Sequence, residues 1–117
     1  MKRFLAVYTG TPDARGSSGW DALPEAERKQ REAEGIAAWH EWGKTHGASV
    51  VVEGGPLGKT LRASRDGITP IRNGLAGFVV VEAESHEAAA RMFERHPHFT
   101  IFPGEAVEIM ECLPIPG

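Results

Sequence analysis

The chain of 117 residues contains four short stretches that are rich in β-branched and aromatic residues. Such stretches, bounded by glycine, proline or polar residues, are typical of β-strands. In the third stretch, alternate residues point to opposite faces, and both faces are largely apolar. The predicted strands are Lys2–Thr9, Ala48–Glu53, Leu75–Ala83 and Ala106–Leu113.

Two predicted helices connect these strands in pairs. The first begins near Asp21–Pro24 and runs to about His46 or Gly47, with proline in its first turn and acidic residues at its positive end. The second begins after Ser85, a residue type that caps helices, and runs to about Arg95. The residues of the first helix that we expect to face the sheet are Glu32, Ala33, Ile36, Trp39, His40 and Gly43.

The segments between these elements are predicted to be loops and turns. Gly10–Trp20 is rich in Gly, Ser and Pro and is predicted to be a mobile surface loop. Lys59–Arg72 is predicted to form a short hairpin that turns at Asp66-Gly67, and Asn73-Gly74 is a second turn. His96-Pro97-His98 is predicted to be extended because Pro97 stiffens the backbone.

The order strand, helix, strand, hairpin, strand, helix, strand predicts an α+β fold. It is the ferredoxin-like split βαβ arrangement, with an antiparallel sheet, two helices on one face and a small β-hairpin insertion. Two helices cover only one face of the sheet, whereas strands that are apolar on both faces are normally covered on both. Exposing such a face costs ~25 cal/mol per Å² of apolar surface. We therefore expect a second copy to pack sheet to sheet, forming a homodimer.

Composition and charge narrow the class of protein further. The length predicts a single domain, residues 1–117. A net charge of -3 without a dense Lys/Arg run argues against nucleic acid or a membrane surface as a partner. The apolar run at the N-terminus is too short for a signal peptide. Cys112, the single cysteine, is expected to be a buried, reduced thiol. We expect a cytoplasmic protein, and the sequence indicates no cofactor.

Three motifs stand out along the chain: Gly54-Gly55-Pro56-Leu57, the Asp66-Gly67 turn, and the run Leu75–Ser85 with the Glu-Ala-Ala-Ala that follows it. Together they resemble the YCII-related, DGPF-type domains of bacteria. The ending is similar to a small uncharacterised branch of that family, through His96-Pro97-His98-Phe99, Phe102-Pro103-Gly104 and the final run Val107–Gly117. The resemblance implies a dimeric α+β barrel that is built from ferredoxin-like protomers.

The resemblance also implies a chemistry. Some members of the family are thought to use a His-Asp dyad in lyase-type or dehalogenation reactions on small aromatic or carbonyl compounds. The position that corresponds to the helical histidine is Ala38, and His40 lies two residues away, about 200° around the helix. The segment Asp66–Pro70 (DGITP) stands in place of the DGPF motif. At both positions the chain departs from the family pattern.

His40 is the candidate on the first helix because it shares the stripe that is predicted to face the sheet. An imidazole exchanges protons near neutral pH, so it suits general acid-base chemistry. Asp66 and Glu53 are the acids that could pair with it. The alternative is a core histidine that is hydrogen-bonded to the backbone.

His96 and His98 form a second candidate site. On an extended segment two such imidazoles could bind a substrate carboxylate, relay protons or ligate a metal. A metal is not expected, because a third and a fourth ligand with suitable spacing are missing. His96 alone could instead end the second helix favourably. His98, which precedes Phe99, is the stronger candidate.

Arg72 and Trp39 complete the set of candidates. Arg72 could hold a substrate carboxylate in bidentate fashion, although the basic hairpin could equally be a solvated surface that protects an exposed edge. Trp39 supplies a large apolar surface with an N–H donor, which suits either core packing or the wall of a pocket.

These residues predict a homodimer with a small-molecule pocket between the sheet, the first helix and segment 96–102. In the enzymatic interpretation a histidine moves a proton, an aspartate orients it and an arginine anchors an acidic substrate. The alternative is a non-catalytic ligand-sensing or protein-interaction module, because this fold hosts both classes. The predicted catalytic residues are His40, His98 and Asp66, and the predicted substrate-binding residues are Arg72, His96, Trp39 and Phe99.

Overall fold

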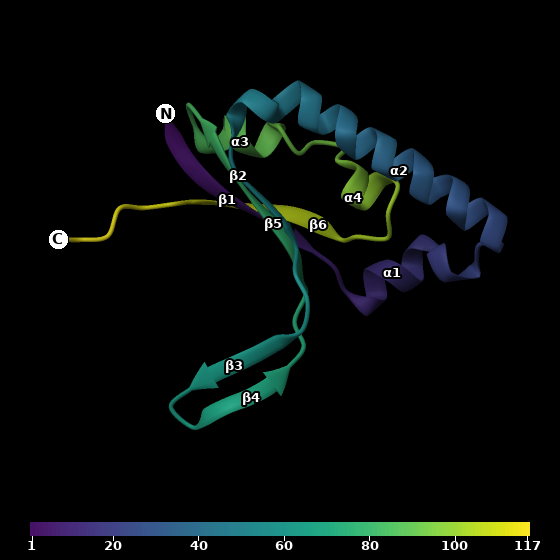
Figure 1. Ribbon diagram of the computed structural model, residues 1–117, viewed down its shortest axis with the longest axis horizontal. Helices are drawn as coiled ribbons and strands as arrows, with labels where there is room; N and C mark the ends of the chain where they lie inside the picture. The colour runs from purple at the N-terminus through teal and green to yellow at the C-terminus, as the bar shows by residue number, and fades with distance from the viewer.

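The computed structural model describes residues 1–117 and contains a four-stranded sheet (Figure 1). Its strands are β1 (Lys2–Thr9), β2 (Val50–Pro56), β5 (Leu75–Ala83) and β6 (Ala106–Glu111). The strand order is β2-β5-β1-β6, and every neighbouring pair is antiparallel. This is the ferredoxin-like order, in which the first and third sheet strands lie at the centre. The predicted α+β fold is confirmed.

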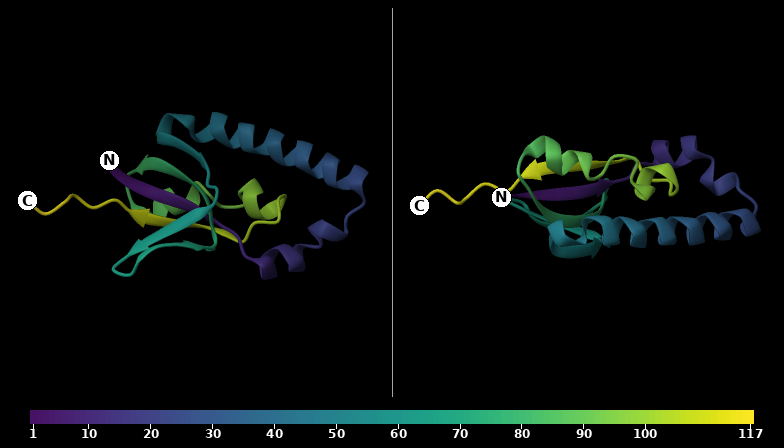
Figure 2. Two further views of the ribbon diagram at one scale, coloured as in Figure 1. Left: turned by 60° about the horizontal axis from the view of Figure 1, so that its bottom comes forward. Right: turned by 90° about the horizontal axis from the view of Figure 1, so that it is seen from above.

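Helices connect the strands and pack against one face of the sheet (Figure 2). Between β5 and β6 the chain forms α3, which the Ser85 hydroxyl caps by accepting a hydrogen bond of 3.0 Å from the Ala88 N–H. Short 3₁₀ turns flank α2 at Trp20–Ala22 and Gly47–Ser49. The α-helices are α1 (Pro12–Ser18), α2 (Glu25–His46), α3 (His86–Arg91) and α4 (Pro97–Thr100).

The long helix α2 has a sequence that favours a helix but few aliphatic residues to bury. Glu25 and Glu27 lie in its first turn, and Lys44 and His46 lie in its last turn, so the charges complement the helix dipole. The predicted sheet-facing stripe is correct for Trp39 but is otherwise displaced around the helix. Gly35 is the buried residue of α2, whereas Ile36 is 54% exposed and His40 is exposed. The inward face carries Gly35 and Trp42 beside Trp39.

The core lies between the helices and one face of the sheet. It contains Phe4, Ala6 and Tyr8 of β1, together with alternate residues of β5 and the α3 side chains. On the opposite face β1 presents Leu5, which pairs with Val80 of β5 and Met110 of β6. The predicted alternation along the strands is therefore confirmed. The opposite face is apolar at its centre, carries the Arg3–Glu82 ion pair towards one end, and is not covered by a helix.

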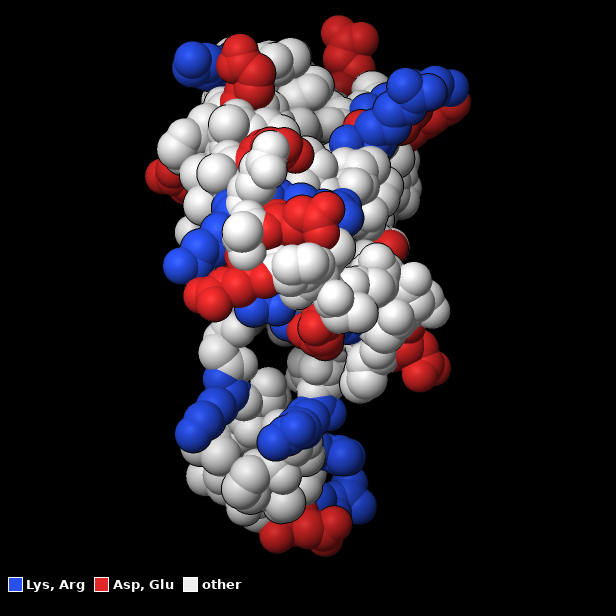
Figure 3. Space-filling view, turned by 90° about the vertical axis from the view of Figure 1, so that its right-hand side faces the viewer, with Lys and Arg blue, Asp and Glu red and all other residues white.

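A hairpin of β3 (Thr60–Ser64) and β4 (Gly67–Ile71) projects away from the sheet, as predicted (Figure 1). Its basic side chains stand out in Figure 3. Two of its apolar residues are also largely exposed, Leu61 at 69% and Ile68 at 73%. Segment 59–72 contains four basic residues and one acidic residue, a net charge of +3, so the rest of the chain carries -6.

Three local predictions are wrong. Much of Gly10–Trp20 is not a loop, because Pro12–Ser18 forms α1, whose N-terminus Thr11 caps by accepting from the Ala14 N–H at 3.0 Å. His96-Pro97-His98 is not extended, because proline occupies the first turn of α4, a position that needs no N–H donor. Cys112 is exposed, because β6 ends one residue before it.

The chain is flat rather than spherical. It extends over 55 × 42 × 19 Å, and its radius of gyration is 16.1 Å, whereas a compact chain of this length has about 13 Å. None of the helices is both long enough and apolar enough to cross a lipid bilayer.

Gly54 provides a test of the junction between β2 and β5. Its φ is +64°, and a Cβ at this position would clash with the carbonyl group of Phe78 on the neighbouring strand. We expect Gly54→Ala to lower the free energy of unfolding by about 2 to 4 kcal/mol, measured by urea titration at fixed protein concentration. The control is Gly58→Ala, where a Cβ would meet open space; equal effects of the two changes would contradict this account.

Candidate functional site

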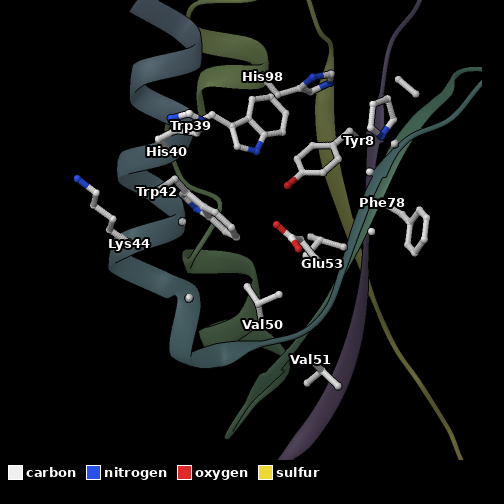
Figure 4. Close-up of a pocket in the computed structure, with 18 residues that line it drawn as sticks. Tyr8, Trp39, His40, Trp42, Lys44, Val50, Val51, Glu53, Phe78 and His98 are labelled. Atoms are coloured by element: carbon white, nitrogen blue, oxygen red, sulfur yellow. The ribbon is translucent and has the colours of Figure 1, made fainter.

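An open cavity of about 1030 Å³ lies between α2 and the sheet, beside strands β2 and β5 (Figure 4). Its walls come from the last three turns of α2, from β2, and from β5. A volume of this size is enough for a small organic ligand. Most of the lining is apolar or aromatic, so its few polar groups determine what the cavity can do chemically.

Tyr8 supplies a phenol to this cavity from the central strand β1. Its ring is 6% exposed and packs 5.1 Å from the Trp39 ring, centroid to centroid. The hydroxyl is directed into the cavity and makes no hydrogen bond with another group of the chain (Figure 4). Burial raises the pKa of Tyr8 to about 12, because the phenolate would lose its hydration. Tyr8 is therefore a neutral donor at physiological pH.

Trp39 and Trp42 form the helical wall of the cavity. Three residues apart on α2, they lie on the same side of the helix. The Trp42 indole N–H donates to the Met92 carbonyl at 2.7 Å, which fixes that ring against α3 and the segment after it. Trp39 packs edge to face against His96 at 4.5 Å between centroids. The two indoles are consequently held by packing and do not depend on a ligand for their placement.

Glu53 is the acidic group that points into the cavity (Figure 4). It lies on β2 within an irregular stretch of pairing with β5, between the register shifts at Val52 and Gly55. A bulge of this kind redirects side chains relative to a regular strand. The Glu53 carboxylate takes part in none of the seven ion pairs and none of the side-chain hydrogen bonds of the chain. It remains available to a ligand.

His96 lies behind the cavity wall and is fully buried. Its Nδ1 accepts a hydrogen bond of 3.0 Å from the His98 backbone N–H, which caps α4. Its Nε2 has no hydrogen-bond partner and is surrounded by aromatic rings. Burial, together with the smaller effect of positive charge on His98 and His46, lowers the pKa of His96 to about 4. His96 is thus neutral at pH 7 and acts in packing and capping.

His98 is the histidine that reaches the cavity from behind. Its Nε2 lies 2.7 Å from the Thr9 carbonyl oxygen, which can only accept, so Nε2 carries the proton of the neutral ring. Gly104 packs directly against the imidazole and helps to fix it, because a Cβ there would clash with the ring. In this tautomer Nδ1 is the ring nitrogen that keeps a free lone pair.

The other predicted site residues lie at the rim of the cavity or outside it. His40 lines the cavity from the exposed side of α2 and does not face the sheet. Asp66 and Arg72 belong to the hairpin region and do not line it. Phe99 lines a separate cavity of about 280 Å³ beside β6. The structure therefore brings together Trp39, His40 and His98, with His96 behind them.

Sequence reasoning missed Tyr8 as a site residue and considered Glu53 only as a partner for His40. A signal for Tyr8 was present, because the alternation along the first strand places it on the same face as Phe4 and Ala6. A tyrosine at an inward position brings a hydroxyl to the core that needs a partner. Gly54-Gly55 is a signal for a bulge beside Glu53, but it does not tell which way the Glu53 side chain points.

No three side chains of His, Cys, Asp or Glu lie close enough together to hold a metal ion. No histidine forms an ion pair or a hydrogen bond with a carboxylate. Acid-base chemistry in this cavity would therefore use separate groups around a bound compound and not a preformed His-carboxylate pair.

The burial of neutral His96 predicts a specific pH dependence of stability. Between pH 6.5 and 4 the unfolded chain protonates this residue and the folded chain does not, so the free energy of unfolding falls as the pH falls. The loss is about 1.4 kcal/mol per pH unit across this window, and this contribution is constant above and below it. We expect His96→Asn, whose side-chain oxygen can still cap α4, to have a flatter profile in urea titrations between pH 7.5 and 4. If the free energy of unfolding of the two proteins changed with pH in parallel, the buried neutral state of His96 would be contradicted.

No sequence profile of a known protein family matches the chain, and no curated protein matches it. Among solved structures, the fold is similar to that of 5-chloro-2-hydroxyhydroquinone dehydrochlorinase from Burkholderia phenoliruptrix AC1100, in complex with 2,5-dihydroxybenzoquinone. The two align with a TM-score of 0.52 and 21% sequence identity, over 92% of this chain and 90% of the dehydrochlorinase chain. At this level of identity, the comparison shows a shared fold.

Proposed function

We propose that this chain is a YCII-related homodimeric protein of the bacterial cytoplasm that binds a small aromatic compound and performs acid-base chemistry on it. The observation that carries the proposal is the open cavity whose aromatic walls surround the Tyr8 hydroxyl, the Glu53 carboxylate and the His98 imidazole. The motifs that resemble YCII-related domains support the family. The fold shared with a dehydrochlorinase that acts on an aromatic compound supports the class of ligand.

The proposed chemistry follows from the protonation states in the cavity. His98 takes up a proton from the bound compound at Nδ1, because Nε2 donates to the Thr9 carbonyl. Tyr8, which stays protonated, donates a hydrogen bond to the substrate oxygen on which negative charge develops. His40 lies at the rim, where it can exchange the proton with solvent. Within one chain Asp66 and Arg72 have no role in this scheme, since neither lines the cavity.

A ligand-sensing module is the second candidate, and one observation favours it. No histidine is paired with an acid, whereas a preformed pair is the usual mark of an activated base. The open cavity is compatible with both functions. An absorbance assay would distinguish the two functions. An enzyme would convert a bound compound and change its absorbance, whereas a sensor would bind the compound without converting it.

The homodimer in the proposal rests on the exposed surface of the single chain. A folded protein of 12.7 kDa is expected to expose about 6200 Å², but this chain exposes 8383 Å². The excess is about 2100 Å² per chain. If two copies bury this surface against each other, the interface has the size that is typical of obligate dimers. The uncovered sheet face, with Leu5, Val80 and Met110, is an apolar surface suited to such packing. Opposite charges on the hairpin and on the rest of the chain would also attract two copies.

The dimer is tested at the centre of the uncovered sheet face. We expect the wild-type protein to have twice the mass of 12.7 kDa by light scattering at micromolar concentration. Val80→Lys would place a charge in the interface and give a monomer. Gln30→Lys makes the same charge change on the exposed side of α2 and should stay dimeric. A monomeric wild-type protein at micromolar concentration would refute the proposed dimer.

The ligand is tested by thermal shift with small hydroxylated aromatic compounds, hydroquinone first. A compound at 100 times its dissociation constant should stabilise the fold by about 2.7 kcal/mol, a clear rise in Tm. His98→Gln keeps a side-chain N–H donor for the Thr9 carbonyl but removes the imidazole, and we expect it to bind the compound about fivefold more weakly and to abolish any conversion. An unchanged affinity and an unchanged rate in this variant would exclude His98 from the site.

A further inference from the structure

The charged groups around the main cavity are unevenly distributed. Glu53 is the acidic side chain that points into it, and nothing in the chain neutralises its carboxylate. Lys44, the lysine of the lining, is directed away from the cavity and lies 3.9 Å from Glu41 on the outer side of α2 (Figure 4). No arginine lines the cavity. The open side of the cavity therefore presents the exposed Glu53 carboxylate, and no lysine or arginine side chain is directed toward it.

The neutral groups of the cavity reinforce this polarity. His96 behind the wall is uncharged at pH 7, because burial keeps its pKa at about 4. The Tyr8 phenol is protonated and uncharged as well. Around the same space lie the rings of Tyr8, Trp39 and Trp42, and the face of an aromatic ring carries the negative end of its quadrupole.

We propose that this cavity binds a small organic ammonium ion, whose charge rests against the rings of Tyr8, Trp39 and Trp42 and is balanced by the carboxylate of Glu53. The inference rests on the proposed function in one respect, that the cavity is the ligand site. It adds that the ligand carries a positive charge. A carboxylate ligand would face Glu53 without a counter-charge, so the anionic substrate predicted from Arg72 does not suit this cavity.

The aromatic walls favour a methylated ammonium. A primary ammonium has three N–H donors, each of which needs an acceptor when it leaves water, and the indole rings of the helical wall offer none. A quaternary or tertiary ammonium instead presents methyl groups to the indole rings and keeps a diffuse positive charge, the combination that aromatic cages recognise.

Calorimetry with two soluble probes of the same shape tests the charge directly. Choline carries a quaternary nitrogen, and 3,3-dimethylbutan-1-ol has a neutral carbon in its place. We expect the wild-type dimer to bind choline at least tenfold more tightly than the neutral alcohol. Glu53→Gln should lower the affinity for choline about tenfold and change the affinity for the alcohol less than twofold. Glu41→Gln removes a carboxylate of α2 that does not line the cavity, and it should leave both affinities unchanged.

A second variant guards against a folding defect. Trp39→Leu removes one aromatic face and should lower the affinity for choline severalfold more than the affinity for the alcohol. Glu53→Gln and Trp39→Leu must both retain cooperative thermal unfolding. Equal binding of the two probes, or a Glu53→Gln protein that binds choline normally, overturns the proposal. If the protein binds hydroquinone but does not bind choline, the cavity remains a ligand site and only its preference for a cation is overturned. If choline, the alcohol, hydroquinone and benzoate all fail to bind at tens of millimolar, the proposed function and this inference fall together.

Discussion

The packing of α2 on the sheet through aromatic rings is the interaction on which the rest of the structure depends. Ile36, an aliphatic residue of this helix, is more than half exposed, so the attachment relies on Trp39 and Trp42. Their rings lie 4.5 and 5.2 Å from the His96 ring, and Trp39 lies 5.1 Å from Tyr8. Large flat rings cannot fill the space between a straight helix and a twisted sheet completely. The cavity is the space that remains beyond the edge of this cluster, and its aromatic walls are the same rings that hold the helix.

The buried His96 has a structural role in this cluster and does not reach the ligand cavity. His96 contributes a flat ring to the packing and an Nδ1 acceptor to the cap of α4, and both uses require the neutral form. Its Nε2 remains unpaired, a cost that a phenylalanine would avoid, but phenylalanine could not cap the helix. The cap orients α4 so that His98, two residues later, reaches the Thr9 carbonyl. The positioning of His98 thus depends on His96 being neutral, as it is at pH 7.

Sequence patterns were sufficient for the fold but only partly sufficient for the site. Period-two alternation located β1 and β5 to the residue, and the Ser85 cap located the start of α3, because these signals are local. The end of α3 was misplaced, since the helix ends at Arg91 and not near Arg95. The inward face of α2 was misplaced, because its buried side is marked by Gly35 and two tryptophans instead of an aliphatic stripe. A glycine buried where Phe102 crosses the helix can be identified only when both segments are placed. The inward turn of Glu53 likewise depends on irregular pairing between β2 and β5, which no local pattern records.

Neighbouring residues of β1 serve opposite faces of the sheet, and this links the cavity to the proposed dimer. Tyr8 points to the helices and the cavity, whereas Leu5 belongs to the face that we propose a second copy covers. Because the strand period is two, a shift of register by one residue would exchange the two sets. Packing on the uncovered face would therefore restrain the strand that carries the Tyr8 hydroxyl. In such an arrangement the partner contributes to the site without touching a ligand, since it fixes the sheet against which α2 holds the aromatic walls.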